Sequence, residues 1–147
     1  MRATRLLLFC LFLLLSVLGC EPDPRNDAHL FLDRVERIDL DDPVEVRRRR
    51  VDSLATLPVT AEVVRLARDA CVDAHRAVIE AEEAAASARE ILEEYEDEAS
   101  IPATERQRFE RSIETSRRAM DRSRNLFRSC HDRTNDLSLR YRNRRSG

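Results

Sequence analysis

The second half of the chain carries a heptad repeat that leaves little choice of fold. Across residues 60–99, and again across 109–141, apolar or small residues recur at alternating spacings of three and four. Such a repeat lines one side of an α-helix, where a second helix can pack. The seam residues are Val64, Ala67, Cys71, Ala74, Val78, Ala81, Ala85, Ala88, Leu92, Tyr95 and Ala99, then Phe109, Ile113, Ser116, Met120, Ser123, Phe127, Cys130, Thr134, Leu137 and Tyr141. The sequence therefore predicts two long helices, over about residues 60–98 and 105–141.

The break between the two segments predicts how the helices pair. Ser100-Ile101-Pro102 interrupts the repeat, and Thr104 with Gln107 matches a capping box at the start of a new helix. Two helices joined by so short a link are expected to run antiparallel. If the chain folds back in this link, Cys71 comes to lie opposite Cys130, and small seam residues face large ones at several layers. We therefore expect an antiparallel two-helix coiled-coil hairpin.

Two short helices are predicted before the hairpin. The first, over about residues 28–38, places apolar residues at helical spacing. The second, over about 43–55, follows Asp42-Pro43, which offers an N-cap and then a proline at the first helical position. We expect both to pack at the open end of the hairpin, opposite the turn. The fold class is then all-α, with a single domain over residues 28–147.

Glycine is almost absent, since Gly19 and Gly147 are the only two in the chain. Without internal glycine the chain lacks phosphate-cradling loops and nucleophile elbows. A catalytic group of Ser, His and acidic residues would have to assemble on exposed helix faces, with no pocket to exclude water. We expect a protein that is not an enzyme and has no small-molecule substrate. The net charge of −2 gives no argument for nucleic acid as a partner.

The first twenty residues have the pattern of a secretion signal. Arg2 and Arg5 precede an apolar run over residues 6–15. This run is too short to span a bilayer as a permanent helix, which is typical of a signal peptide that is cleaved. It is followed by Val17-Leu18-Gly19-Cys20, so small or aliphatic residues precede a cysteine.

That segment resembles the lipobox of bacterial lipoproteins, in which the cysteine that matches Cys20 is lipidated and becomes the first residue. The resemblance implies a signal peptide cleaved off as residues 1–19 and a lipidated tether over 20–27. It also implies diacylglycerol and an N-acyl chain such as palmitate on Cys20, with no other cofactor. An ordinary secretory signal that happens to contain a cysteine is the alternative.

The resemblance further implies attachment to the bacterial cell envelope through the lipid. In enteric bacteria, an aspartate after the lipidated cysteine favours retention in the inner membrane. The residue at that position here is Glu21, so the resemblance favours the outer membrane, with the protein facing the periplasm.

Cys71 and Cys130 remain once the cysteines of the signal segment are set aside. An even pair in an oxidising compartment is typical of a disulfide, and we predict one here. A redox-active pair would favour a Cys-x-x-Cys spacing or an exposed setting, which seam positions do not offer. A zinc site with His75 and His131 is a further alternative. However, Cys130 and His131 are sequence neighbours about 100° apart around a helix, so they can hardly converge on one ion.

The charges are unevenly distributed along the hairpin. Residues 80–98 hold nine acids and one arginine, whereas residues 106–145 hold thirteen arginines and five acids. We expect an acidic turn and a basic open end that contacts anionic headgroups or another polyanion; two solvated faces are the alternative. The arginines expected in this contact are Arg47, Arg48, Arg49, Arg50, Arg140, Arg142, Arg144 and Arg145.

A second apolar row lies beside the seam. Its members are Val63, Ala70, Ala77, Ala84 and Ile91 on the first long helix and Ala119 and Leu126 on the second. The combined stripe is wider than a two-helix coil buries, and the short helices cannot easily reach its distal end. We therefore expect Ala84 and Ile91 to bind a protein partner or a second copy.

These features together predict a lipid-anchored, non-catalytic envelope protein that acts as a structural or adaptor protein through its helical surface. A periplasmic inhibitor or sensor of one envelope protein and a holdase-like chaperone are the alternatives.

Overall fold

The computed structural model describes residues 23–95 and 97–142, with side chains up to Tyr141. Within these ranges all regular structure is helical, which confirms the predicted all-α class. The elements are α2 (Pro24–Val35), α3 (Val44–Ala55), α4 (Glu62–Glu93), a 3-10 turn η1 (Glu98–Ser100), α5 (Ala103–Leu137) and a π-helical turn η2 (Ser138–Arg142). The predicted signal peptide and Cys20 lie outside the described residues.

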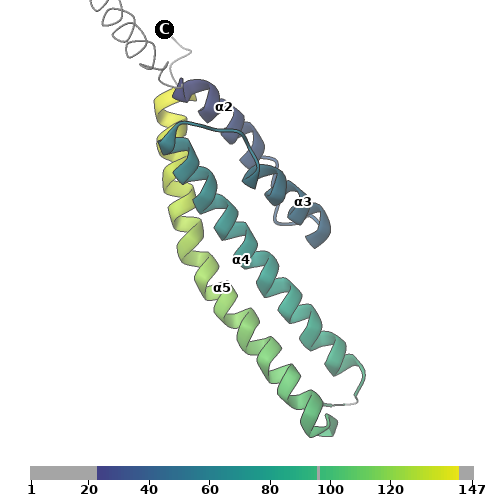
Figure 1. Cartoon of the computed structure of the whole chain (residues 1–147). Coiled ribbons are helices and arrows are strands. Elements are labelled where there is room, and N and C mark those ends of the chain that lie inside the picture. The colour runs from purple at the N-terminus through teal and green to yellow at the C-terminus, as the bar shows by residue number, and fades with distance from the viewer. Residues whose placement is uncertain (1–22, 96, 143–147) are drawn as a thin grey trace, which may run out of the picture.

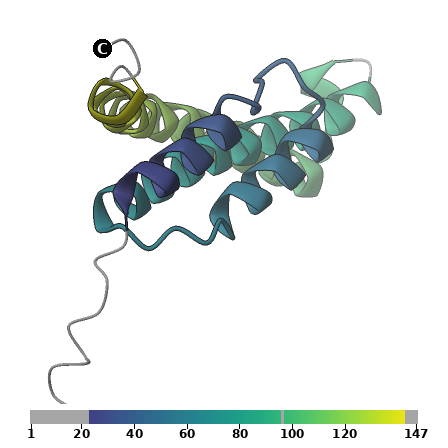
Figure 2. The same cartoon turned by 90° about the horizontal axis from the view of Figure 1, so that it is seen from above.

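The two long helices, α4 and α5, pack side by side along their length (Figure 1). Their connection through η1 lies at one end of the pair. α2 and α3 lie against α4 toward the other end, where α2 also contacts η2 (Figures 1 and 2). No helix among the described residues combines the length and hydrophobicity that crossing a membrane would require.

The start of α2 differs from the sequence prediction. Asp23 accepts a hydrogen bond from the backbone N–H of Arg25 at 3.0 Å, and Pro24 occupies the first helical turn. An aspartate N-cap followed by proline favours helix initiation at this point. The segment 24–27, expected to belong to the tether, is therefore already helical.

Asp27 then caps a different helix. Its carboxylate accepts hydrogen bonds from the backbone N–H groups of Thr60 at 2.6 Å and Ala61 at 2.7 Å, at the start of α4. The N-cap residue of α4, Ala61, makes no side-chain cap hydrogen bond of its own. Partial burial favours a higher pKa for Asp27, but the hydrogen bonds to its charged form outweigh it and lower this pKa. Asp27 thus fixes α2 to the beginning of α4.

The caps around the other helices also differ from expectation. α5 begins at Ala103 with no side-chain cap, so the predicted capping box at Thr104 is wrong. A capping box forms instead in the link, where the Asp97 side chain accepts from the backbone N–H of Ser100 at 2.8 Å. This box defines η1, and α4 accordingly ends at Glu93 rather than near residue 98.

At the end of α4 and α5 that lies opposite η1, α2, α3, α4 and α5 share one hydrophobic core. Phe31, Leu54, Val64 and Leu137 are fully buried within it. Each comes from a different helix, so neither α2 nor α3 could bury its apolar face alone. This shared burial explains why the two short helices fold onto the long pair.

Toward the turn, α4 and α5 bury residues of both apolar rows: Ala81 and Ala88 of the seam, and Ala77, Ile91 and Ala119 of the second row. Ile91 is 6% exposed and Ala119 is fully buried, whereas Leu92, Ile113 and Met120 from the seam are 40%, 47% and 38% exposed. On α5 the small Ala119 is buried and its neighbour Met120 is exposed, since a small residue at a helix contact permits a closer approach than methionine would. The prediction that Ile91 stays open for a partner is therefore wrong, and Ala84 is partly buried.

Candidate functional site

Cys71 and Cys130 form a disulfide between α4 and α5, as the sequence predicted. Both residues are buried, and their Cα atoms lie 4.6 Å apart. The two sulfurs are bonded to each other, so the zinc set weighed with His75 and His131 lacks two thiolates. Among the described residues, no group of three or more His, Cys, Asp or Glu is placed to hold a metal ion.

Arg47 is buried, which contradicts its predicted role at an anionic surface. Its side chain is only 2% exposed. Nη1 donates to Oε1 of Glu82 at 2.9 Å and Nη2 donates to Oε2, so the guanidinium and the carboxylate form a two-point pair. Residues in an arginine run point about 100° apart around a helix, so one member turns toward α4. Because a guanidinium stays charged in proteins, Glu82 is required beside it.

His75 lies close to this pair and is also buried. Its ring packs edge-on against Phe127 with the centroids 5.0 Å apart. Burial and, to a smaller extent, the positive charge of Arg47 together lower the pKa of His75 to about 4. The Nδ1 atom of His75 has no hydrogen-bond partner among the described residues. His75 is therefore neutral at neutral pH.

The buried His75 predicts a loss of stability as the pH falls. The unfolded chain protonates this ring near pH 6.5, whereas the folded protein resists until about pH 4. Between these values the unfolded state binds more protons, so acidification favours unfolding. At 1.36 kcal/mol per pKa unit, the contribution of His75 should lower the free energy of unfolding by about 2 kcal/mol from pH 8 to pH 5. Urea unfolding at both pH values measures it.

The control separates His75 from the many carboxylates that also titrate. His75→Leu should remove about that amount of the pH dependence, whereas His131→Gln, which alters an exposed histidine, should retain the wild-type profile. Identical pH dependence in His75→Leu and the wild-type protein would contradict the assignment of a buried neutral ring.

The remaining arginines of the predicted contact have different surroundings. Arg48 pairs with Glu83, in the second half of α4, and both side chains are about half exposed. Arg49 and Arg50 face away from α4 and line a cavity between α2 and α3. Arg140 donates to Asp136 one turn earlier on the same segment, at 2.8 Å. Of the other predicted contacts, Arg144 and Arg145 lie outside the described residues, as does the side chain of Arg142.

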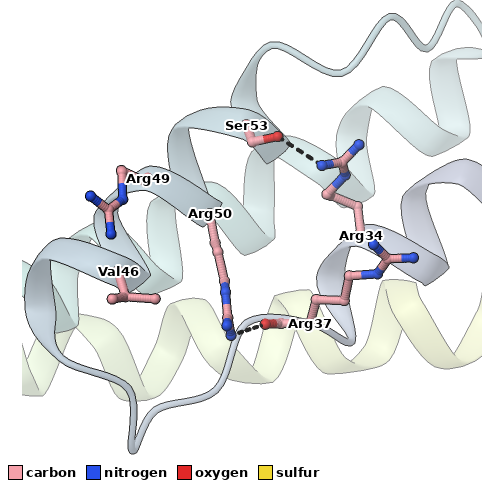
Figure 3. A pocket seen from close by; sticks show the side chains of 6 residues that line it. All are labelled: Arg34, Arg37, Val46, Arg49, Arg50 and Ser53. Atoms are coloured by element: carbon pink, nitrogen blue, oxygen red, sulfur yellow. Dashed lines mark hydrogen bonds between the residues drawn. The ribbon is translucent and has the colours of Figure 1, made fainter.

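An open cavity of about 610 Å³ lies between the end of α2 and the outer face of α3 (Figure 3). We call it the arginine cavity. Four arginines and two smaller residues line it: Arg34, Arg37, Val46, Arg49, Arg50 and Ser53. The arginine run in the sequence indicates Arg49 and Arg50 but not Arg34 or Arg37, because only the chain reversal between α2 and α3 brings these two close to the run.

Hydrogen bonds hold part of this lining in place. Arg34 Nη1 donates to the hydroxyl of Ser53 at 3.0 Å. Arg50 Nη1 donates both to the carbonyl oxygen of Arg37 and to the carboxylate of Asp42. Figure 3 shows Arg34 and Arg37 on one side of the cavity, Arg49 on the other, and Arg50 between them. No family model, curated protein or solved structure matches this chain.

Proposed function

We propose that this chain is a lipid-anchored protein of the bacterial cell envelope, without catalytic activity, that acts as a structural or adaptor protein through its helical surface. The observation that carries the proposal is the lipobox ending at Cys20. The first cap of the folded domain, Asp23, follows almost directly. A lipid on Cys20 would hold the domain close to the membrane, and acyl chains contribute about 0.8 kcal/mol per buried methylene.

The proposed domain is an antiparallel coiled-coil hairpin. Three kinds of contact support this: the disulfide Cys71–Cys130, the ring contact of His75 with Phe127, and the ion pair of Glu80 with Arg122. Along α4 these residues ascend in number while their partners on α5 descend, which is the order that an antiparallel pair produces. At 1.5 Å per residue, α5 would extend the hairpin to about 50 Å.

The proposed location is the outer membrane, facing the periplasm. Glu21, rather than aspartate, follows the cysteine. The disulfide supports an oxidising compartment, since such bonds persist outside the cytoplasm and are rare inside it.

The surface that we propose for an adaptor role lies on α4 and α5. Leu92, Ile113 and Met120 present large apolar side chains to solvent there. Exposed apolar side chains that gather in one region are typical of protein contact sites, whereas isolated ones are common on any surface. These three residues take the place of Ala84 and Ile91 as candidates for contacting a protein partner or a second copy.

Substituting the anchor tests the proposal directly. Cys20→Ala should abolish incorporation of labelled palmitate and leave an unprocessed precursor or a soluble product, because the lipidated atom is the cysteine sulfur. Cell fractionation with metabolic lipid labelling measures both effects. Processing and membrane attachment equal to wild type in Cys20→Ala would refute the lipoprotein assignment.

Crosslinking in the same cells tests the adaptor role. The wild-type protein should yield adducts with itself or with an envelope protein, and Cys20→Ala should lose them together with its attachment. Adducts with itself would favour a structural role, whereas a single heterologous adduct would favour an inhibitor or sensor. The absence of any specific adduct in wild-type cells would refute an adaptor role.

A further inference from the structure

The arginine cavity concentrates positive charge that the protein does not neutralise. Among the four guanidinium groups, the one carboxylate bonded within the described residues is Asp42, which binds Arg50. Arg34 donates to a neutral hydroxyl. Arg37 and Arg49 have no carboxylate partner among the described residues, and both side chains are exposed. The cavity therefore has an excess of positive charge.

The clustering of these arginines distinguishes the cavity, because arginines without an ion pair also occur elsewhere. Arg48 binds Glu83 and Arg76 binds Asp52, whereas Arg65 and Arg128 have no ion pair within the described residues. A second cavity, lined by Arg48 and Arg76, includes the carboxylates of Asp52, Glu80 and Glu83 in its lining, whereas the lining of the arginine cavity includes none. Cations without partners around one cavity indicate a site whose counter-charge comes from a ligand.

Guanidinium groups select the chemistry of that ligand. Their planar fork of donors matches the oxygens of phosphate and carboxylate, and charge-assisted bonds of this kind are stronger than neutral ones. Ser53 offers a hydroxyl at the same wall, and Val46 adds an apolar surface. We propose that the arginine cavity binds a phosphate-bearing anion through Arg34, Arg37 and Arg49.

The arrangement favours a ligand larger than a single phosphate ion. Arg34 lies on α2 and Arg37 in the turn that follows it, whereas Arg49 lies on α3 on the opposite side of the cavity (Figure 3). A volume of about 610 Å³ leaves room for two linked phosphate groups, or for one phosphate on an organic body. The natural source is either a soluble phosphate compound or the phosphorylated headgroup of a membrane lipid.

Pyrophosphate is a suitable first probe, because it carries two linked phosphate groups and no organic body. The full chain, as the cell processes it, is purified in neutral detergent, and pyrophosphate binding is measured by equilibrium dialysis. The double variant Arg37→Gln/Arg49→Gln removes two charges that make no ion pair within the described residues, so the fold should persist. Loss of two charge-assisted contacts should weaken pyrophosphate binding by about tenfold or more, and added salt should weaken wild-type binding.

A matched control removes the same charge elsewhere. Arg65→Gln/Arg128→Gln alters two exposed arginines outside the cavity lining and should bind pyrophosphate as the wild-type protein does. An equal loss in both double variants would show a general effect of surface charge and would overturn the proposal. The proposal would also be overturned if the wild-type protein bound neither pyrophosphate nor phosphatidic acid.

Phosphatidic acid distinguishes the two sources. The protein is reconstituted in phosphatidylcholine vesicles with or without this phosphomonoester lipid, and pyrophosphate binding is measured again. If phosphatidic acid reduces pyrophosphate binding in the wild-type protein but not in Arg37→Gln/Arg49→Gln, the cavity binds a lipid headgroup. If pyrophosphate binds equally well with and without phosphatidic acid, the cavity binds a soluble ligand. Pyrophosphate binding in detergent does not require lipidation, so failure here is distinguishable from failure of the Cys20 anchor.

Discussion

The double variant Cys71→Ala/Cys130→Ala should lose about 4 kcal/mol of unfolding free energy, because the disulfide closes a loop of 59 residues and restricts the unfolded chain. That amount is a large share of the total stability of a small domain. Urea unfolding of the wild-type protein and the double variant, both under oxidising conditions, measures the difference. Labelling of free thiols on the native oxidised protein should find neither residue.

The control for this experiment is the reductant itself. Dithiothreitol should destabilise the wild-type protein toward the double variant, and should leave the variant unchanged because it has no disulfide to reduce. Full labelling of both thiols without reductant, or equal stability of the oxidised and reduced wild-type protein, would contradict the disulfide.

Glu82→Gln should lower the free energy of unfolding by about 3 kcal/mol, since it leaves the buried Arg47 without its charged partner. The expected loss is at the low end for buried pairs because the Glu82 side chain is 35% exposed. Urea unfolding at neutral pH measures the loss. Replacing both partners, as in Arg47→Met/Glu82→Leu, should recover much of it, because no buried charge remains.

The neighbouring ion pair provides a matched control. Glu83→Gln removes the same type of charge one residue along the chain, but its partner Arg48 is about half exposed. Exposed pairs contribute little, so the expected change is below about 1 kcal/mol. Equal losses of unfolding free energy in Glu82→Gln and Glu83→Gln would contradict the prediction, because they would show that the buried pair contributes no more stability than the exposed one.

The sequence by itself determined the helical class, the two long helices and the cysteine pairing. Each depends on the local periodicity of apolar residues or on the position of a break in it. Because an α-helix has a fixed repeat, this spacing alone shows which residues share one side of the helix. The pairing of Cys71 with Cys130 needed one further element, the link around Ile101, which sets the register of both helices.

The tertiary structure alone decided which of two neighbouring apolar residues is buried near the turn and where the arginines point. Ile91 and Leu92 are adjacent and both apolar, so the choice between them depends on how closely α4 and α5 approach. Arg47 and Arg49 belong to one run, yet one is buried against Glu82 and the other lines a cavity. The spacing of residues in the sequence cannot predict either arrangement, because each brings together residues from separate helices. The relative positions of those helices depend on the packing of the whole core.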